Sequence, residues 1–547
     1  MRRPAQQIVF SMHIQKTIGN TAPIAVQRPG DECKNGSRGQ RRSPLLHVIE
    51  LMLPPLSTLR AQAFCAPASA TCRWILAALL GLNAMVAGVA TAEEAVIGNQ
   101  PGEQDFPALS IGASGGYLAF EDNRTGSGRD GRDISAVALN SELQAHGEPF
   151  RVNQLSLGKN EKPQVLTLGN GNTLFAWEVR QGSKAGIYTR VLGTNGLFTS
   201  GDTLLNIPTL KQTIKQTAKW TAHYRGKWKA RTHKFKDIIT NTREQAGAVS
   251  MAALPDGGAV LVYHAVRRCE TNSWSLVNHV YLSHGEFRTN ALLKPVRMTG
   301  DWMHDVFMQR LDAAGQKVGE EILVNQNTDF NQRTPSVATL ENGNLVVAWV
   351  SESPVSSDWR ANFHVDLKGR VFDAQGQPIS DDLPIAVDDI LIQANPVVSA
   401  TTGGGFTVLW SQQEGTTTRG WDVYARSFGA DASASGAAFR VNSYTTGDQF
   451  APRIASSGGQ QLVVWTSISQ DGSREGVFGR VLQSGALAEP EFQVNATTVS
   501  RQYHPAVATD GQGRALTVWA GFVGAATGFD LFSHKSALGN GETGASR

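Results

Sequence analysis

Seven times along this 547-residue chain, a short apolar segment preceded by a Gly-rich turn ends in a large aromatic residue. In six of the seven copies, a proline stands thirteen or fourteen residues before the aromatic. The aromatics are Phe120, Trp177, Tyr263, Trp349, Trp410, Trp465 and Trp519, and the prolines are Pro107, Pro163, Pro335, Pro396, Pro452 and Pro505. A period of this kind, filled with strand-forming residues and turns, is typical of an array of small sheets.

Each repeat unit carries the pattern of four short strands with turns between them. After the aromatic come a polar loop, a third strand such as residues 477–482, a turn, and a fourth strand that ends in a Val-Asn pair. β-Branched and aromatic residues alternate along these segments, as in half-buried strands. One such sheet cannot bury both of its faces, whereas seven sheets stacked around an axis can. We therefore predict an all-β fold, a seven-bladed β-propeller of four-stranded blades.

The two ends of the repeat region complement each other. The seventh unit stops without a fourth strand, and the segment Glu94–Asn99 precedes the first unit where an outer strand would stand. We predict that this segment pairs with the last blade, which would close the ring and remove an exposed sheet edge. Eight blades are an alternative, because the 119 residues from Asn206 to Asn325 nearly equal two repeats. Only one Gly-rich turn with an aromatic strand is recognisable there.

The clearest copies lie at residues 322–351 and 439–510 and approximate a general form: F-x-V-N, a polar stretch with Gln, P-x-V-A-x-L, a Gly-rich turn, and an apolar strand that ends in Trp. This form resembles a repeat of secreted and surface-attached bacterial proteins, and the resemblance covers residues 94–535. It implies a β-propeller-like array in an extracellular protein, of the kind that accompanies adhesins and calcium-binding exoproteins. The repeat itself carries no catalytic motif.

An export signal is predicted upstream of the repeats. In residues 73–92, Arg73 precedes an apolar run that ends in Ala90-Thr91-Ala92, a small-x-small cleavage pattern. We read this segment as a signal peptide cut after Ala92, with an uncleaved membrane anchor as the alternative. Residues 1–72 are interpreted as a disordered leader or an over-extended start, residues 93–540 as a single propeller, and residues 541–547 as a tail. Cleavage would leave a secreted, periplasmic or cell-surface protein without a membrane span.

The net charge and the cysteine content limit the partners and the covalent cross-links that can be expected. The formal net charge of +3 points to no polyelectrolyte partner for the chain as a whole. Of the four cysteines, Cys269 alone would remain after cleavage, so the mature chain could form no internal disulfide.

Unit three breaks the repeat with two insertions, residues 207–246 and 264–304. In a four-stranded blade, the connection that enters the blade and the loop between its second and third strands emerge on the same face. The two insertions should therefore lie together. Long loops on a rigid scaffold are places where binding residues concentrate.

The first insertion interleaves cations with aromatic rings. Between Lys211 and Lys236 it holds nine Lys or Arg residues and no acid. Such a segment suits an anionic polymer, because the cations neutralise acidic groups and the rings stack on sugar faces. For an exported protein, we predict an anionic polysaccharide or cell-surface component rather than nucleic acid; a solvated basic loop is the alternative. The candidate ligand-binding residues are Trp220, Tyr224, Lys227, Trp228, Lys229, Arg231, Lys234 and Lys236.

Signals for catalysis or cofactors are weak. Cys269, His264, His279, His284 and His304 do not form the combination of a Cys pair and a His pair that is typical of a zinc site, and no acidic loop matches a known calcium loop. We therefore expect no cofactor, with calcium as a weak alternative.

No His-Glu-x-x-His motif, P-loop or sialidase-type box is present. The predicted function is a non-catalytic binding or cell-surface module. The alternative is a polysaccharide hydrolase or lyase, for which Glu121, Asp122 and Asp471 could supply carboxylates.

Two further residue types recur at fixed places and are interpreted as structural. A glutamine three positions before the proline should satisfy backbone groups of the connection between units. An arginine on the third strand should pair with a carboxylate or stack on an aromatic ring of the neighbouring blade. These residues are Gln104, Gln332, Gln393, Gln449 and Gln502, with Arg190, Arg310, Arg370, Arg426 and Arg480.

Overall fold

The computed structural model describes residues 94–539, except 99, 125–130, 156–158, 181–184, 206–208, 225–226, 284–285, 301–302, 329, 355–362, 388–390, 414–419 and 525–527. For residues 209–245 and 267–300 it describes the backbone alone. The predicted leader, signal peptide and C-terminal tail lie outside the described residues. Within this part of the chain there is no helix, and so none that could span a membrane.

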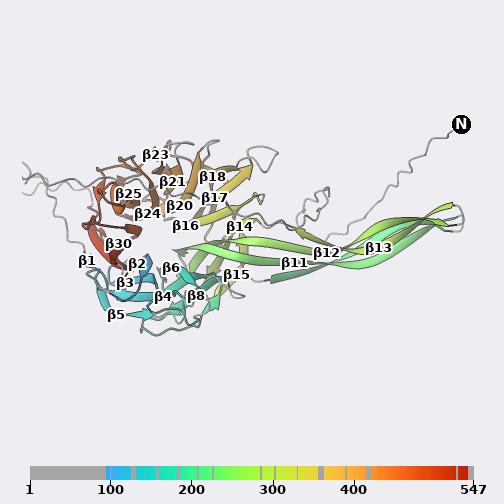
Figure 1. Cartoon of the computed structure of the whole chain (residues 1–547), viewed down its shortest axis with the longest axis horizontal. Helices are drawn as coiled ribbons and strands as arrows, with labels where there is room; N and C mark the ends of the chain where they lie inside the picture. The colour runs from blue at the N-terminus through green and yellow to red at the C-terminus, as the bar shows by residue number, and fades with distance from the viewer. Residues whose placement is uncertain are drawn as a thin grey trace, which may run out of the picture. The chain divides into compact units, whose positions relative to one another are not determined.

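The described strands form small antiparallel sheets whose order along the chain follows the repeat units (Figure 1). Unit one is the sheet β2 (Gln104–Gly112), β3 (Gly115–Asp122), β4 (Asp133–Leu139) and β5 (Ala145–Arg151). Unit two is the sheet β6 (Asn160–Thr167), β7 (Thr173–Val179), β8 (Gly186–Leu192) and β9 (Thr203–Leu204).

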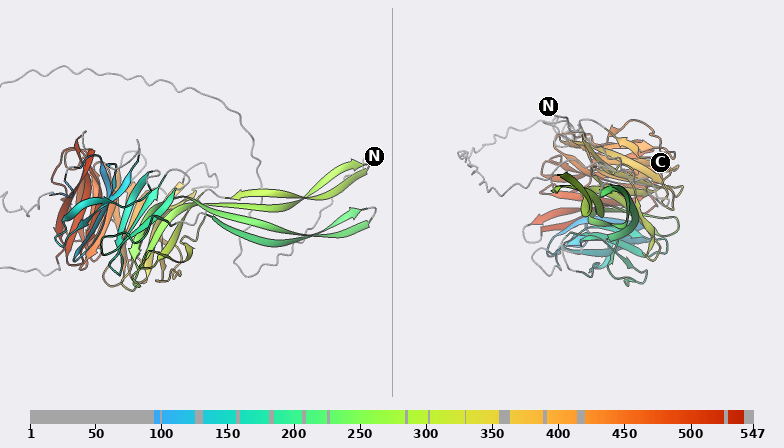
Figure 2. Two further views of the ribbon diagram at one scale, coloured as in Figure 1. Left: turned by 90° about the horizontal axis from the view of Figure 1, so that it is seen from below. Right: turned by 90° about the vertical axis from the view of Figure 1, so that its right-hand side faces the viewer.

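Unit three combines a sheet of ordinary size with two long ribbons. Its strands are β10 (Thr209–Tyr224), β11 (Lys227–Ala253), β12 (Ala259–Ser283), β13 (Glu286–Gly300), β14 (His304–Leu311) and β15 (Lys317–Leu323). The last part of β11 and the first part of β12 pair with each other, and β14 and β15 complete that sheet. Beyond it, β11 continues in a ribbon with β10, and β12 continues in a ribbon with β13 (Figure 2).

Units four to seven repeat the short pattern. Unit four holds β16 (Gln332–Thr339), β17 (Leu345–Pro354), β18 (Phe363–Phe372) and β19 (Leu383–Ala386), and unit five holds β20 (Ile392–Ala400), β21 (Phe406–Gln413), β22 (Trp421–Phe428) and β23 (Phe439–Arg440). Unit six holds β24 (Gln449–Ser457), β25 (Gln460–Ile468), β26 (Glu475–Gln483), β27 (Ala486–Leu487) and β28 (Phe492–Gln493). Unit seven holds β29 (Gln502–Thr509), β30 (Arg514–Gly524) and β31 (Gly528–Ala537). A single parallel bridge, Val365 to Ile392, links the sheets of units four and five.

The fourth strand of the last sheet comes from the start of the described chain. In β1 (Glu94–Ala95), Glu94 pairs with Ser533 and Ala95 with Phe532 of β31. The Val96 N–H donates to the Leu531 carbonyl at 2.9 Å. The pairing expected for the segment from Glu94 is therefore present at its first residues.

The core lies between neighbouring sheets. Among the described residues, the buried side chains form seven clusters, each shared by two units. Val347 and Trp349 pack towards unit three, whereas Val346 and Ala348 pack towards unit five. Because both faces of the second strand are buried, that strand is an almost continuous apolar run instead of an alternating one.

The units pack in succession through their first strands. Contacts join β2 to β6, β6 to β11, β11 to β16, β16 to β20, β20 to β24, β24 to β29 and β29 to β2. One core cluster likewise joins Leu118 and Phe120 of unit one to Leu516 and Val518 of unit seven. The fold is thus all-β and β-propeller-like.

The asparagine of the Val-Asn pair and several of the recurrent glutamines bind backbone groups, and for the glutamines this role was expected. The side-chain oxygen of Asn442 accepts the Val423 N–H at 2.8 Å, and its amide donates to the Tyr444 carbonyl at 2.8 Å. The recurrent glutamines include Gln449, which donates to the Thr446 carbonyl at 3.1 Å, and Gln502, which donates to the Val499 carbonyl at 2.8 Å.

Arg310 pairs with a carboxylate, that of Asp256 at 2.8 Å, as expected, and Arg190 lies over the Phe198 ring of its own unit. Other arginines have backbone partners, which were not expected. Arg480 donates to the Val441 carbonyl of the preceding unit at 2.8 Å, and Arg370 donates likewise to Val324 at 2.9 Å. These arginines therefore join units through main-chain carbonyls, whose positions do not depend on the side chains of the neighbouring unit.

Candidate functional site

The face from which the inter-unit connections emerge carries a repeated backbone distortion. We call it the crossover face; the loops between second and third strands emerge there too. In each unit, one residue near the start of the first strand has φ between 48° and 54°, and the pairing register shifts beside it. These seven residues are Phe106, Lys162, Ala248, Thr334, Asn395, Ala451 and His504, and all but Ala248 precede a proline. A left-handed conformation in residues other than glycine is costly and often accompanies functional sites.

Four of these distorted residues are held by a side chain of the preceding unit. The acceptor always follows the repeat aromatic. Lys162 N–H donates to Glu121 Oε1 at 2.8 Å, and Ala248 N–H donates to Glu178 Oε1 at 2.5 Å. In the other two cases, Thr334 N–H donates to His264 Nδ1 at 3.2 Å and Ala451 N–H donates to Ser411 Oγ at 3.1 Å. The polar residue after the aromatic therefore joins neighbouring units at the crossover face.

Cations at this face are half-exposed and lie on buried carboxylates. The Arg132 side chain is 34% exposed and contacts Glu121, which is 2% exposed, at 2.5 Å. Lys162 is 40% exposed and Arg180 is 51% exposed, and both contact Glu178, itself 2% exposed, at 3.6 and 3.3 Å.

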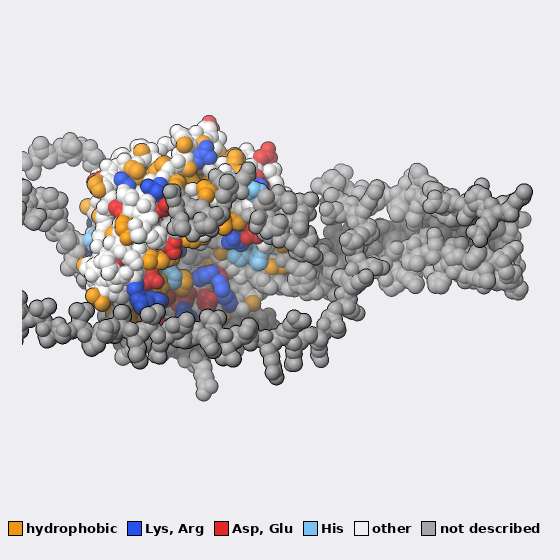
Figure 3. Space-filling view, turned by 45° about the horizontal axis from the view of Figure 1, so that its top comes forward, with side chains coloured by type: hydrophobic (Ala, Val, Ile, Leu, Met, Phe, Trp, Pro, Cys, Tyr) orange, Lys and Arg blue, Asp and Glu red, His pale blue; other side chains and the backbone are white. Residues whose placement is uncertain are grey.

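Unit four adds a fourth cation, which lies on a partly buried carboxylate. Arg333, which is 37% exposed, contacts Glu352, which is 17% exposed, at 2.7 Å. In each of these ion pairs the cation is more exposed than its carboxylate, although Glu103, at 3.7 Å from Arg132, is an exposed acid. Charged and histidine side chains gather around a hollowed part of the molecular surface in Figure 3.

Burial changes the titration of Glu121. Desolvation raises the pKa of its carboxyl above the ordinary value, and the nearby charge of Asp105 adds to that shift. The hydrogen bonds from Lys162 N–H and Arg132 act in the opposite direction. A carboxyl with a raised pKa beside a second carboxylate is the kind of group that serves as a general acid.

Asp105 joins unit one to unit seven. Its Oδ1 lies 2.8 Å from His504 Nδ1, and its Oδ2 accepts from the Tyr503 hydroxyl at 3.4 Å. Phe106 stacks on the His504 ring with centroids 3.9 Å apart. Burial and the Asp105 charge raise the pKa of Tyr503 above its usual range. A carboxylate, a phenol and an imidazole thus meet beside the Glu121–Arg132 pair.

The two histidines at the ends of the second insertion, His264 in β12 and His304 in β14, lie close together. The His264 and His304 rings lie 4.9 Å apart, edge to face, and His304 Nδ1 is 3.2 Å from Asn331 Oδ1. Desolvation, aided by the charges of His304 and nearby Lys and Arg residues, lowers the pKa of His264 to about 3. The side chains of Cys269, His279 and His284 lie outside the described part of the structure. Among the described residues, no group of three or more His, Cys, Asp or Glu side chains is arranged to hold a metal.

The predicted polysaccharide-binding residues lie on the ribbon of β10 and β11. The pairing of Trp220 with Arg231 and of Tyr224 with Lys227 sets its register. Since successive residues of a strand alternate between faces, the candidates divide into two sets. Trp220, Tyr224, Lys227, Lys229 and Arg231 share one face by register, and Trp228, Lys234 and Lys236 share the other.

The two insertions lie together, as expected, because β11 pairs with β12 from Ile238 with Asn272 to Arg243 with Arg267. They form paired strands, whereas long loops were expected.

The carboxylates considered for hydrolysis do not converge. Asp122 accepts from the Ser135 hydroxyl at 2.8 Å within unit one. Asp471 accepts from the Ser473 N–H at 3.0 Å within unit six. The pair that the structure brings together is Glu121 with Asp105, and the sequence analysis did not include Asp105, Tyr503 or His504. The position directly before the repeat proline is the signal that could have found His504.

Comparison with known proteins identifies no family. No family model and no curated protein matches the chain. Among solved structures, a protein of unknown function from Dyadobacter fermentans has a TM-score of 0.41 at 11% identity, over 69% of this chain and 94% of that one.

Two enzymes of known structure are similarly distant. The NanB sialidase of Streptococcus pneumoniae has a TM-score of 0.39 at 8% identity, over 82% and 71% of the two chains. The α-L-arabinofuranosidase of Fusarium graminearum has a TM-score of 0.39 at 11% identity, over 82% and 99%. Similarities this weak transfer neither an activity nor a substrate to this chain.

Proposed function

We propose that this chain is an exported bacterial β-propeller of seven blades that binds an anionic polysaccharide at its crossover face. The seven blades are the seven repeat units. The packing of each first strand on the next, including β29 on β2, supports the ring. The pairing of β1 with β31 supports its closure.

The observation that carries the proposed function is the arrangement of half-exposed cations over buried carboxylates. The carboxylates hold the cations in place, and burial keeps their own charge away from a ligand. Arg132, Lys162, Arg180 and Arg333 would then meet the acid groups of a polysaccharide chain, which arginine and lysine bind through charge-assisted hydrogen bonds.

The basic ribbon adds to this arrangement. β11 runs without a break from the ribbon into the sheet of unit three, and its residue Ala248 is one of the distorted residues of the crossover face. Trp220 and Tyr224 share a ribbon face with several cations, and their rings would stack on the sugars of the polysaccharide whose acid groups the cations of the crossover face bind.

The proposal is tested by retention on immobilised alginate, with neutral dextran as the reference matrix. An Arg180→Gln and Arg333→Gln double variant should elute at lower salt than the wild-type chain, because two contacts to uronate groups are lost. The control is an Arg514→Gln and Lys317→Gln variant, which removes the same charge at the start of β30 and β15, on the opposite face. Equal retention of both variants would rule out a site at the crossover face.

A second candidate function is polysaccharide hydrolysis or elimination at the same face. The raised pKa of Glu121, beside Asp105, Tyr503 and His504, is the observation that favours it. The binding proposal predicts that alginate incubated with the protein gains no new chain ends. Release of chain ends by the wild-type protein, abolished by Glu121→Gln, would replace the first function by the second.

A further inference from the structure

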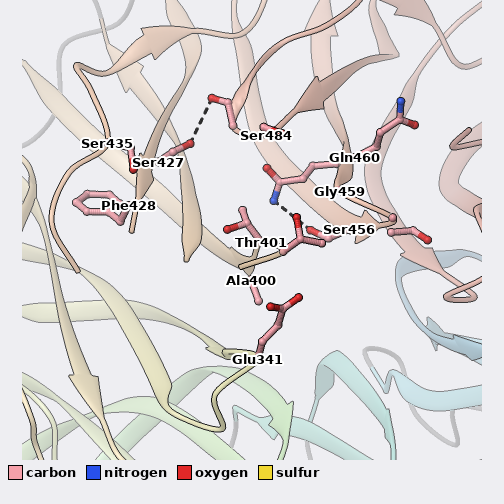
Figure 4. Close-up of a pocket in the computed structure, with 15 residues that line it drawn as sticks. Glu341, Ala400, Thr401, Ser427, Phe428, Ser435, Ser456, Gly459, Gln460 and Ser484 are labelled. Atoms are coloured by element: carbon pink, nitrogen blue, oxygen red, sulfur yellow. Dashed lines mark hydrogen bonds between the residues drawn. The ribbon is translucent and has the colours of Figure 1, made fainter. Parts of the chain in front are cut away.

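A pocket of about 350 Å³ lies among the turns of units four, five and six, away from the crossover face. Turns between first and second strands and between third and fourth strands emerge on the opposite face, and these turns supply its lining. Figure 4 shows residues of separate turns side by side around the pocket. The residues that bear on its chemistry are Glu341, Thr401, Ser427, Ser435, Gln460 and Ser484.

The pocket exists because two turns depart from the pattern of their neighbours. In units two, three and four, the first residue of the turn after the first strand is a buried leucine: Leu168, Leu254 and Leu340. Unit five places Thr401 there, and the turn of unit six shortens to Gly458-Gly459. Two neighbouring units, five and six, therefore lack the leucine side chain at this place in the turn.

The lining is rich in hydroxyl groups and carries almost no charge. Glu341 is its one ionisable residue, and its Oε2 accepts the Gly403 N–H at 2.8 Å. The Ser427 hydroxyl donates to the Gly485 carbonyl at 3.3 Å. Within the described part of the chain, the hydroxyls of Thr401, Ser435 and Ser484 have no hydrogen-bond partner, so they are available to a ligand.

These features define the ligand class. Hydroxyl groups both donate and accept hydrogen bonds, as the hydroxyls of a sugar do, and a carboxylate accepts from sugar hydroxyls. The absence of Lys and Arg from the lining, together with Glu341, disfavours an anion. The volume lies within the range of small-molecule sites. We propose that this pocket binds a neutral sugar of one or two residues, independently of the polysaccharide site on the crossover face.

The decisive variant is Thr401→Leu, which restores the residue that three other units carry at this position. It should fill the pocket without harm to folding, since a cavity is removed rather than created. Saturation-transfer NMR of the full-length chain with maltose, glucose, galactose and mannose should detect millimolar binding of at least one sugar by the wild-type chain. Thr401→Leu should weaken it by about tenfold or more. The control is Thr498→Leu, at an exposed position of the connection between units six and seven, on the crossover face.

A second measurement separates sugar recognition from loss of structure. Glu341→Gln keeps the shape of the side chain and removes its charge, so glucuronate should bind this variant better than the wild-type chain. Unchanged sugar binding by Thr401→Leu would overturn the proposal. So would failure of all four neutral sugars to bind the wild-type chain at about 20 mM.

Discussion

At the scale of single residues, one position links the core to the crossover face. It directly follows the repeat aromatic, where Glu121, Glu178, His264 and Ser411 each accept an N–H from the next unit. Carboxylate, imidazole and hydroxyl serve equally, because the backbone donor requires only an acceptor. Different residue types can therefore occupy this position. In units one and two it is a glutamate, Glu121 or Glu178, whose buried carboxylate contacts half-exposed cations.

His264 makes this position sensitive to pH. Its Nδ1 accepts the Thr334 N–H, which requires the neutral ring. The pKa is about 3 in the folded chain against 6.5 for an ordinary histidine, so the unfolded chain takes up the proton first. The stabilisation from the neutral ring is complete above pH 6.5 and is lost progressively as the pH falls towards 3.

We therefore predict that His264→Gln, which keeps an acceptor for Thr334, flattens the pH dependence of stability. Urea unfolding midpoints at about pH 7.5 and about pH 5 should differ less in the variant than in the wild-type chain. His146→Gln, at an exposed position of β5, is the control and should behave as the wild-type chain does. An undiminished pH dependence in His264→Gln would show that other groups cause it.

At the scale of elements, the β10–β11 ribbon is the largest departure from the repeat. Sixteen register pairs join its strands, from Thr209–Thr242 to Tyr224–Lys227, which corresponds to roughly 50 Å of paired chain. The register gives the two faces different compositions. One face holds Trp220 and Tyr224 with three cations at 227, 229 and 231, and the other holds Trp228 with lysines at 211, 215, 219, 234 and 236.

The two faces of the ribbon can be compared at equal charge. Replacing Lys227, Lys229 and Arg231 by glutamine should reduce retention on alginate more than replacing Lys215, Lys219 and Lys234. The first set shares its face with Trp220 and Tyr224, whereas the second set shares its face with Trp228, so fewer of the candidate rings can stack on sugars beside the second set. Elution of both variants at the same salt concentration would indicate that the ribbon attracts the polymer only through its overall charge.

At the scale of the whole molecule, the ends of the repeat region meet in one sheet. β1 supplies the outermost strand beside β31, and Val96 and Ile97 pack on the cluster shared by units one and seven. Without β1, the edge of β31 would be exposed and the contact between the first and last units would lose part of its core. The first described residues thus help to stabilise β31, which lies more than four hundred residues later in the chain.

Val96→Pro should lower the free energy of unfolding by about 1–3 kcal/mol, since it removes the N–H that donates to Leu531. Val96→Ala keeps that N–H and should cost less. Thermal and urea unfolding of the two variants beside the wild-type chain provide the measurement. Equal losses in both variants would show that side-chain packing of Val96, and not strand pairing, stabilises this junction.

The sequence by itself determined the all-β class, the four-strand units and the pairing of the segment from Glu94 with the last unit. These features follow from local patterns: the apolar second strand, the turn glycines and the Val-Asn pair each repeat along the chain. The structural role of glutamines such as Gln449 and Gln502 was predictable for the same reason, because a residue that repeats in a repeated fold can bind the same backbone group in each unit.

Only the tertiary structure decided which polar residues meet. Asp105 lies beside Tyr503 and His504 because the first and last units are neighbours, although 399 positions separate Asp105 from His504. The arrangement of exposed cations over buried carboxylates depends on burial, which residue type does not reveal. The neutral pocket likewise depends on what is missing, a leucine at Thr401 and a shortened turn in unit six. A short sequence pattern specifies contacts along a strand, whereas contacts between units depend on the packing of the whole array.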